Sequence, residues 1–317
     1  MSTTTIPVIN IGPYLDGTDK QGVADLVGKA CEEIGFFMIQ GHNIPLDLMQ
    51  QVQGGATKFF DLPLDTKQLT TAPFGLGYMG EGTENVAATL KGKEESKVQD
   101  TKESLNLTLP VRDEVWPNNP PQLNDVCKTY FESVEALASQ LMKLFALALN
   151  LNENFFDDKV DNAFTVLRML NYPAQDPTSV DLSSPATRNA EHTDYGTLTI
   201  LWSPDSRGLQ ARSRQGEWID VVAPLDHFII NIGDLMMNWT NDKWISTLHR
   251  VIPHADTLGK RRMSLPFFHN PNPDAMIECI PGCFDDVSNP AKYQPMLAKS
   301  HLEMKVSKAL GKEEKME

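Results

Sequence analysis

The sequence has few cysteines and no long apolar run. Only four of its 317 residues are cysteines, Cys31, Cys127, Cys279 and Cys283, too few and too scattered for a disulfide framework in a chain of this length. Cys279 and Cys283 would need two further ligands at a matching spacing to hold a metal, and the sequence offers none. No segment approaches the ~18 apolar residues that span a bilayer, and residues 1–5 lack a basic region followed by an apolar stretch. These absences predict a soluble, cytoplasmic protein with reduced thiols and no membrane partner.

The sequence is also poor in positive charge. It has 28 lysines and arginines against 42 aspartates and glutamates, which gives a formal net charge of -14. A nucleic acid would be repelled by this charge, and no basic stripe is visible, so we expect a small-molecule substrate and no nucleic-acid partner. The hydrophobic share of 41% and the charged share of 22% are ordinary for a globular protein and argue against disorder.

Two kinds of periodicity divide the chain. Apolar residues recur every three or four positions over residues 22–34, 46–60 and 122–149, which predicts three helices in the first half. From residue 164 onward, short alternating or apolar runs are separated by Gly, Pro, Asp and Asn, which is typical of a β-sandwich or barrel. The expected strands are 6–11 and 36–40 near the start of the chain, and then 164–170, 197–202, 209–212, 218–222, 228–232, 247–252 and 263–268.

Residues 74–97 interrupt this pattern. Glycines and charged residues are dispersed through the segment with little periodicity. A loop of this length inside a compact protein is usually functional or disordered, so a mobile substrate lid and plain surface disorder are both open on this pattern.

A histidine and a carboxylate stand two residues apart at His192-Thr193-Asp194, where an alternating segment begins. Side chains of an extended chain alternate between two faces, so His192 and Asp194 are expected to project together. One imidazole, one carboxylate and a second, distant histidine form the facial arrangement that binds ferrous iron and leaves positions open for other ligands. His249, in another alternating run, is the best-placed third ligand, and Arg262 and Ser264 further on are expected to share a face.

These motifs, in this order, resemble the iron(II)- and 2-oxoglutarate-dependent oxygenases, in the branch that includes isopenicillin N synthase, plant flavonoid oxygenases and fungal thymine hydroxylase. The resemblance covers nearly the whole chain. Its landmarks are Ile6-Pro7-Val8-Ile9-Asn10, Gly35-Phe36-Phe37-Met38-Ile39, Gly41-His42, Phe59-Phe60-Asp61-Leu62-Pro63, Lys102-Glu103-Ser104, Asn171-Tyr172-Pro173, His192-Thr193-Asp194, Gly208-Leu209-Gln210, Asn231-Ile232-Gly233-Asp234, Ser246-Thr247-Leu248-His249-Arg250-Val251 and Arg262-Met263-Ser264.

The resemblance implies a mainly β fold, a double-stranded β-helix or jelly roll, with the amino-terminal helices packed against it. Residues 1–317 would form one catalytic domain, with a helix-rich region over 1–150, the jelly roll with the iron site over 151–300, and a helix or tail over 301–317. It implies Fe(II) as the metal, and 2-oxoglutarate and O2 as cosubstrates. It also implies a substrate-facing loop at residues 74–97, which we therefore interpret as a mobile lid.

Specific residues also receive roles from the resemblance. His192, Asp194 and His249 would be both the metal ligands and the catalytic centre. Arg262 and Ser264 would bind the far carboxylate of 2-oxoglutarate, a task that suits the planar, bidentate guanidinium. Tyr172 and Asn171 would add hydrogen bonds on the cosubstrate or substrate side.

The expected activity is oxidation of a small metabolite at an unactivated C–H bond, by hydroxylation, desaturation or oxidative ring closure, with 2-oxoglutarate converted to succinate and CO2. Three alternatives remain open on the sequence. One is an oxidase like isopenicillin N synthase that does not consume 2-oxoglutarate. Another is a zinc hydrolase, because zinc also accepts two histidines and an aspartate. The third is a jelly-roll binding protein without catalysis.

Overall fold

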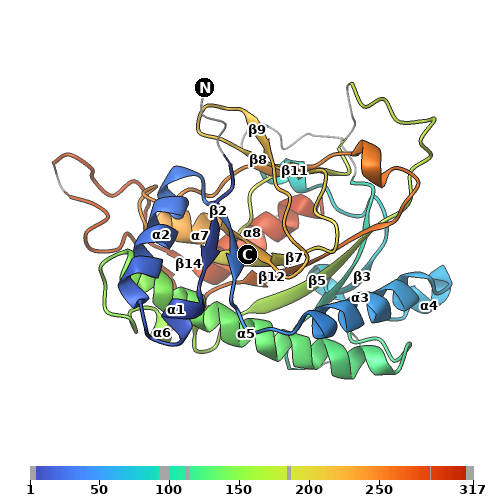
Figure 1. Cartoon of the computed structure of the whole chain (residues 1–317), viewed down its shortest axis with the longest axis horizontal. Helices are drawn as coiled ribbons and strands as arrows, with labels where there is room; N and C mark the ends of the chain where they lie inside the picture. The colour runs from blue at the N-terminus through green and yellow to red at the C-terminus, as the bar shows by residue number, and fades with distance from the viewer. Residues whose placement is uncertain are drawn as a thin grey trace.

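The computed structural model describes residues 5–90, 92, 100–110, 115–183, 187–285 and 287–311. Two antiparallel-rich sheets and a layer of helices dominate these residues (Figure 1). The large sheet has eight strands in the order β1-β2-β10-β7-β12-β5-β4-β3, and the small sheet has four in the order β6-β11-β8-β9. A two-stranded ribbon, β13-β14, completes the set. The mainly β fold with flanking helices is the one that the sequence predicted.

The strands are short, as expected from the turn residues between them. Their bounds are β1 Val8–Asn10, β2 Phe36–Gln40, β3 Gly77–Met79, β4 Glu103–Leu107, β5 Thr165–Tyr172, β6 Asn189–His192, β7 Leu198–Trp202, β8 Leu209–Arg212, β9 Trp218–Asp220, β10 Phe228–Ile232, β11 His249–Val251, β12 Arg262–His269, β13 Met276–Ile277 and β14 Met296–Leu297.

The helices include all three that the periodicity predicted. The α-helices are α1 Gly12–Leu15, α2 Lys20–Glu33, α3 Leu46–Phe60, α4 Leu64–Gln68, α5 Gln122–Ala148, α6 Asp157–Val160, α7 Asp234–Trp239 and α8 Ala298–Ala309, and the 3-10 helices are η1 Pro73–Gly75, η2 Val86–Thr89 and η3 Ala255–Thr257.

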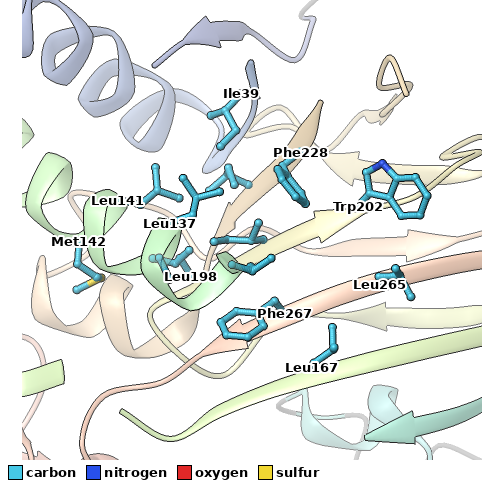
Figure 2. Close-up of a cluster of buried hydrophobic side chains, with 14 of the residues drawn as sticks. Ile39, Leu137, Leu141, Met142, Leu167, Leu198, Trp202, Phe228, Leu265 and Phe267 are labelled. Atoms are coloured by element: carbon cyan, nitrogen blue, oxygen red, sulfur yellow. The ribbon is translucent and has the colours of Figure 1, made fainter. Parts of the chain in front are cut away.

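The long helix α5 packs along the large sheet. Its apolar stripe is buried, and Figure 2 shows Leu137 and Leu141 of α5 beside Leu198 and Phe267 of the sheet. The other face of the same sheet carries alternate residues toward the small sheet, so each central strand separates a dry core from the space between the sheets. The side chains that line the space between the two sheets can therefore form a binding site.

Strands from the first half of the chain extend the large sheet at both ends. β1 and β2 add beside β10, and β3 and β4 add beside β5. Parts of the expected lid therefore join the sheet, because β3 lies within residues 74–97. Residues 91 and 93–97 of that segment lie outside the described residues.

Gly35 shapes the turn between α2 and β2. Its φ is +65°, a left-handed conformation, and a Cβ there would lie 2.1 Å from the carbonyl oxygen of Ile245. The Gly35 carbonyl accepts a hydrogen bond from the Ile232 backbone N–H at 3.0 Å. This close contact places Phe36 against the His249 imidazole, with ring centroids 5.4 Å apart.

We expect Gly35→Ala to lower the free energy of unfolding. The left-handed conformation alone costs an alanine about 1–2 kcal/mol, and the clash with Ile245 adds to that. Gly54→Ala is the matched control, because Gly54 lies within α3 and a Cβ there meets nothing within 4 Å. The control should gain about 0.5–1 kcal/mol in urea denaturation, so loss from both variants or from neither would contradict the argument.

Candidate active site

The three predicted metal ligands meet between the sheets. His249 in β11 is the direct cross-strand partner of His192 in β6, and the two ring centroids are 4.2 Å apart. The Asp194 Oδ1 atom lies 3.8 Å from Nε2 of His192 and 3.7 Å from Nε2 of His249. All three residues are buried. Among the described residues, they are the group of three whose ligand atoms lie within 4.8 Å of one another.

His192 and Asp194 come together in a different way from the strand alternation that the sequence predicted. β6 ends at His192, and Asp194 lies in the connection to β7 rather than in a strand. Strand alternation therefore does not bring the two side chains together. Instead, the backbone carbonyl of Asp194 accepts a hydrogen bond from the N–H of Asp234 at 2.8 Å. Gly233, just before Asp234, packs so tightly on Gly196 that a Cβ would lie 2.3 Å from the Gly196 carbonyl oxygen.

Hydrogen bonds leave one ligand atom without a partner on each of the three side chains. Nδ1 of His192 donates to the Ala190 carbonyl at 2.7 Å, and Nδ1 of His249 donates to the Thr247 carbonyl at 3.0 Å. A carbonyl oxygen can only accept, so Nδ1 carries a proton in both rings, and in a neutral ring Nε2 is then the atom free to bind a metal. Burial, the neighbouring His249 and other charges lower the pKa of His192 to about 3, which keeps its imidazole neutral.

Asp194 presents one oxygen to the same point. Its Oδ2 accepts hydrogen bonds from Thr199 Oγ1 at 2.5 Å and Asn231 Nδ2 at 2.7 Å. Burial alone would raise its pKa, but the two histidines and these hydrogen bonds lower it overall. The carboxylate is ionised, its orientation is fixed, and Oδ1 remains for a metal. Two imidazole nitrogens and one carboxylate oxygen, all from one side, fit ferrous iron.

The predicted cosubstrate residues Arg262 and Ser264 line the same cavity. The Arg262 side chain is buried, and its Nε and Nη1 atoms make no hydrogen bond to any described residue. Burial lowers the pKa of this guanidinium, because no anion compensates the charge fully. An unpaired buried cation at the end of a cavity fits the carboxylate of a bound acid.

Tyr172 faces Arg262, but Asn171 does not. The two strands align Tyr172 with Arg262, and the guanidinium carbon lies 4.9 Å from the centre of the Tyr172 ring. Asn171 points to the other face of β5, where its amide donates to Oε1 of Glu103 at 2.7 Å. The structure thus brings Tyr172 to the cavity and places Asn171 in a separate polar cluster, contrary to the role expected for it.

Three charged residues that the sequence reasoning did not select also line the cavity. They are Glu84, Lys102 and Arg168. Arg168 could have been found, because it lies four residues before Tyr172 on an alternating strand and must share its face. Glu84 gave no comparable local signal, since it comes from the irregular segment, and Lys102 stood in a landmark of the family resemblance without an assigned role.

The cavity is covered by two segments. Glu84 and Val86 come from the expected lid, and Leu302 and Val306 come from α8. The two segments touch, because the Asn85 N–H donates to the Ala309 carbonyl at 2.8 Å. The sequence predicted a helix or tail from residue 301, whereas α8 begins at Ala298.

A buried ion pair attaches α8 to the iron site. Lys305 Nζ lies 2.7 Å from Oδ2 of Asp234, the residue whose N–H bonds the Asp194 carbonyl. Oδ1 of Asp234 accepts a hydrogen bond from Ser246 Oγ at 2.7 Å. The cover of the cavity and the loop that carries Asp194 are therefore parts of one network.

We expect the lid to be protected from proteolysis only in the full complex. Iron-loaded protein, kept anaerobic, should be cleaved within residues 74–97 more slowly when 2-oxoglutarate and a substrate are both bound, because a closed cavity excludes water from the reaction. Cleavage sites mapped by mass spectrometry would check this. Equal cleavage rates with and without the ligands would contradict a gating role.

Comparisons with known proteins agree with this geometry. Residues 6–124 match the family model of the non-haem dioxygenase in morphine synthesis N-terminal region, and residues 163–271 match that of the 2OG-Fe(II) oxygenase superfamily. The chain is 32% identical to the 2-oxoglutarate-Fe(II) type oxidoreductase hxnY of Emericella nidulans, over 99% of this chain and 93% of that one. The chain belongs to the iron(II)- and 2-oxoglutarate-dependent oxygenases.

Other relatives of this oxygenase give the same result. It is 30% identical to homoarginine-6-hydroxylase 2-ODD-233 of rice, Oryza sativa subsp. japonica, over 95% of this chain and 96% of that one. Among solved structures, a full-length Neurospora crassa protein in complex with alpha-KG superposes with a TM-score of 0.85, at 30% identity over 95% of this chain and 96% of that one. The expected jelly-roll core, enzyme class and cofactors are confirmed. The oxygenase acts on a small-molecule metabolite and uses Fe(II), 2-oxoglutarate and O2.

The cofactors and the side chains of the site have different roles in the reaction. When bound, iron with 2-oxoglutarate and dioxygen supplies the oxidising power, and 2-oxoglutarate leaves as succinate and CO2. The Asp194 carboxylate and the two imidazoles would hold the metal in an orientation set by their hydrogen bonds, the Arg262 guanidinium would face the cosubstrate, and apolar side chains line the cavity. Pre-organised donors and exclusion of water favour oxidation of the bound substrate over side reactions.

The helices of the described residues include none that is both long and apolar enough to cross a bilayer.

Proposed function

We propose that this oxygenase binds iron through His192, Asp194 and His249 and oxidises a C–H bond of a small metabolite. The observation that carries the assignment is the pattern of hydrogen bonds around these residues. One polar atom of each side chain has a hydrogen-bond partner. The other atoms lie close together, with Oδ1 of Asp194 3.8 Å from Nε2 of His192 and 3.7 Å from Nε2 of His249. A structural cluster of buried polar groups would be expected to pair all of its atoms.

We assign the cosubstrate to the arginine end of the cavity. Nε and Nη1 of the buried Arg262 have no hydrogen-bond partner among the described residues, and Ser264 and Tyr172 line the same cavity. A guanidinium with unpaired N–H groups is a strong partner for a carboxylate. Leu209 and Val251 line the same cavity as this arginine and the metal ligands, and they would offer the carbon chain of a dicarboxylate an apolar surface.

The substrates named for relatives guide the choice of metabolite. The Neurospora crassa protein has also been solved with alpha-KG and thymine, and the rice relative is a homoarginine hydroxylase. We infer hydroxylation of a similarly small molecule, with residues 1–317 as one catalytic unit. The four free cysteines support a cytoplasmic location, because reducing compartments keep thiols unpaired. A net charge of -14 argues against a nucleic-acid substrate.

The test is a metabolite screen with Fe(II), 2-oxoglutarate and O2, read as substrate-stimulated succinate formation together with a product heavier by one oxygen. The matched control is the same screen without iron. Product without succinate would favour an oxidase that does not consume 2-oxoglutarate. Product that forms without oxygen would favour a hydrolase. No ligand-stimulated turnover with an iron-loaded, 2-oxoglutarate-bound protein would contradict the proposed activity.

A further inference from the structure

We propose that Glu84, Lys102, Arg168 and Asp100 form a charge-balanced subsite that selects an uncharged, planar amide-type substrate. The class meant is a cyclic amide, imide or ureide with adjacent N–H and C=O groups. This inference rests on the proposed function, because Glu84, Lys102 and Arg168 line the same cavity as the proposed iron ligands, and Asp100 pairs with Lys102.

Arg168 is the centre of the subsite. Its Nη1 donates to both Oε1 and Oε2 of Glu84 at 3.1 Å, and its Nε donates to Asn106 Oδ1 at 2.8 Å. Among the described residues, no hydrogen bond to its Nη2 is found, and Nη2 is not among the fully enclosed unpaired atoms. A donor with access to the cavity therefore remains available to a ligand.

Lys102 joins the two carboxylates. Its Nζ lies 3.3 Å from Glu84 Oε2 and 2.8 Å from Asp100 Oδ2. Oδ1 of Asp100 accepts a hydrogen bond at 2.8 Å from the backbone N–H of Ala190, in the strand that ends at His192. The side chains of Lys102 and Asp100 are 4% and 2% exposed, which fixes the cluster relative to the metal ligand.

The formal charges of the subsite cancel. Two cations, Arg168 and Lys102, face two anions, Glu84 and Asp100. Burial alone would raise the pKa of Glu84, but Arg168 and Lys102 lower it to about 2, so the carboxylate is ionised at neutral pH. A ligand with a carboxylate would add a third anion, and one with an ammonium or guanidinium group would add a third cation. Either would leave a buried charge without its counter-charge, which is costly.

An uncharged ligand with adjacent C=O and N–H groups, here called an amide edge, adds no unbalanced charge to the subsite. Its C=O can accept from the free Arg168 N–H, and its neighbouring N–H can donate to Glu84. The carboxylate has about four lone-pair sites, and the three contacts from Arg168 and Lys102 leave one. The amide edge would thus satisfy one donor and one acceptor of the subsite at the same time.

The surroundings favour a flat ligand. The Arg168 guanidinium lies 5.6 Å from the centre of the Phe268 ring, and Phe164 and Pro266 also line the cavity. Aromatic and proline faces pack well against planar rings. Glu84 also belongs to the segment that covers the cavity, so the recognition of the amide edge and the closure of the cover would involve the same side chain.

The experiment measures binding to the anaerobic enzyme loaded with iron and 2-oxoglutarate, through the change in the visible absorption of the iron chelate. The uncharged probes are uracil, thymine, hydantoin and 2-pyridone. The charged probes are orotate and nicotinate as anions and homoarginine as a cation. We expect the best uncharged probe to bind at least about tenfold more tightly than any charged one, a difference that one unbalanced charge readily produces.

Two variants change the charge of the subsite in opposite directions. Glu84→Gln leaves a net charge of +1 and should shift the preference toward orotate or nicotinate. Arg168→Gln leaves -1 and should shift it toward homoarginine. Glu81→Gln is the matched control, because Glu81 is exposed, lies three residues from Glu84 and is outside the cavity. It should leave the ranking of the probes unchanged.

Several outcomes would overturn the inference. They are failure of every uncharged probe to bind, tighter binding of a charged probe to the unmodified enzyme, and an unchanged ranking in both charge variants that fold by circular dichroism. If either variant fails to fold, the ranking of the probes on the unmodified enzyme still decides the question. Loss of 2-oxoglutarate binding in the unmodified enzyme would instead contradict the proposed function, so the two failures are distinguishable.

Discussion

Replacement of His192, Asp194 or His249 by alanine is expected to abolish turnover and to lower iron affinity by more than about 100-fold. Mutation of a residue that only orients a metal ligand typically costs 10–100-fold, and loss of the ligand itself removes one of three bonds to the protein. The geometry supports equal importance for the three residues, because each offers one ligand atom to the same group and these atoms lie within 4.8 Å of one another.

The residues that orient the ligands provide a graded test. Asn231→Ala removes the hydrogen bond that fixes Oδ2 of Asp194, and we expect a loss of iron affinity of about 10–100-fold, smaller than that of the ligand variants. His254→Ala is the matched control, because this histidine caps the exposed helix η3 and lies outside the cavity. Its iron affinity should be unchanged.

Equilibrium dialysis with Fe(II) under anaerobic conditions would measure these affinities, and circular dichroism would verify that each variant is folded. Near-normal iron binding with coupled succinate formation in any one of the three alanine variants would remove that residue from the ligand set. Equal losses from His254→Ala and His249→Ala would mean that the effect is not specific to the metal.

The second large effect is expected from Arg262→Gln, which should weaken 2-oxoglutarate binding by about ten- to a hundredfold without a matching loss of iron. A hydrogen bond to a charged group contributes roughly 1.5–3 kcal/mol, and 1.4 kcal/mol corresponds to about tenfold in affinity. The glutamine keeps polar atoms in place but lacks the charge and the planar pair of N–H donors. Arg262→Lys keeps the charge without that pair, and we expect an intermediate loss.

Arg261→Gln is the natural control, because the neighbouring arginine bonds Asp61 on the outside of the protein rather than facing the cavity. Anaerobic titration of the iron-loaded variants with 2-oxoglutarate would measure the affinities directly. Unchanged affinity in Arg262→Gln, or equal weakening in Arg261→Gln, would mean that Arg262 does not anchor the cosubstrate.

The sequence by itself determined most of the secondary structure. Residues 46–60 were predicted as a helix and form α3 Leu46–Phe60, and the 122–149 prediction corresponds to α5 Gln122–Ala148. These elements were predictable because the periodicity of apolar residues in a helix or strand is a property of residues close in sequence, and it does not depend on the rest of the fold. The same alternation predicted that Arg262 and Ser264 share a face, and both line the cavity.

Only the tertiary structure decided how distant side chains meet. His192 and His249 are cross-strand partners because of the register between β6 and β11, and a shift of one residue would have turned one of them away. Asp194 reaches the same point from a connection whose shape depends on Asp234 and on the tight packing of Gly233, which no local pattern indicates.

Local sequence patterns also failed to predict which polar residues line the cavity. Asn171 was expected at the site beside Tyr172, but adjacent residues of a strand face opposite sides, and Asn171 bonds Glu103 instead. Glu84 and Arg168 are 84 positions apart and meet only because the segment before η2 folds back over β5. Burial of an ion pair depends on that packing, since the charges of the two residues were evident in the sequence but their enclosure was not.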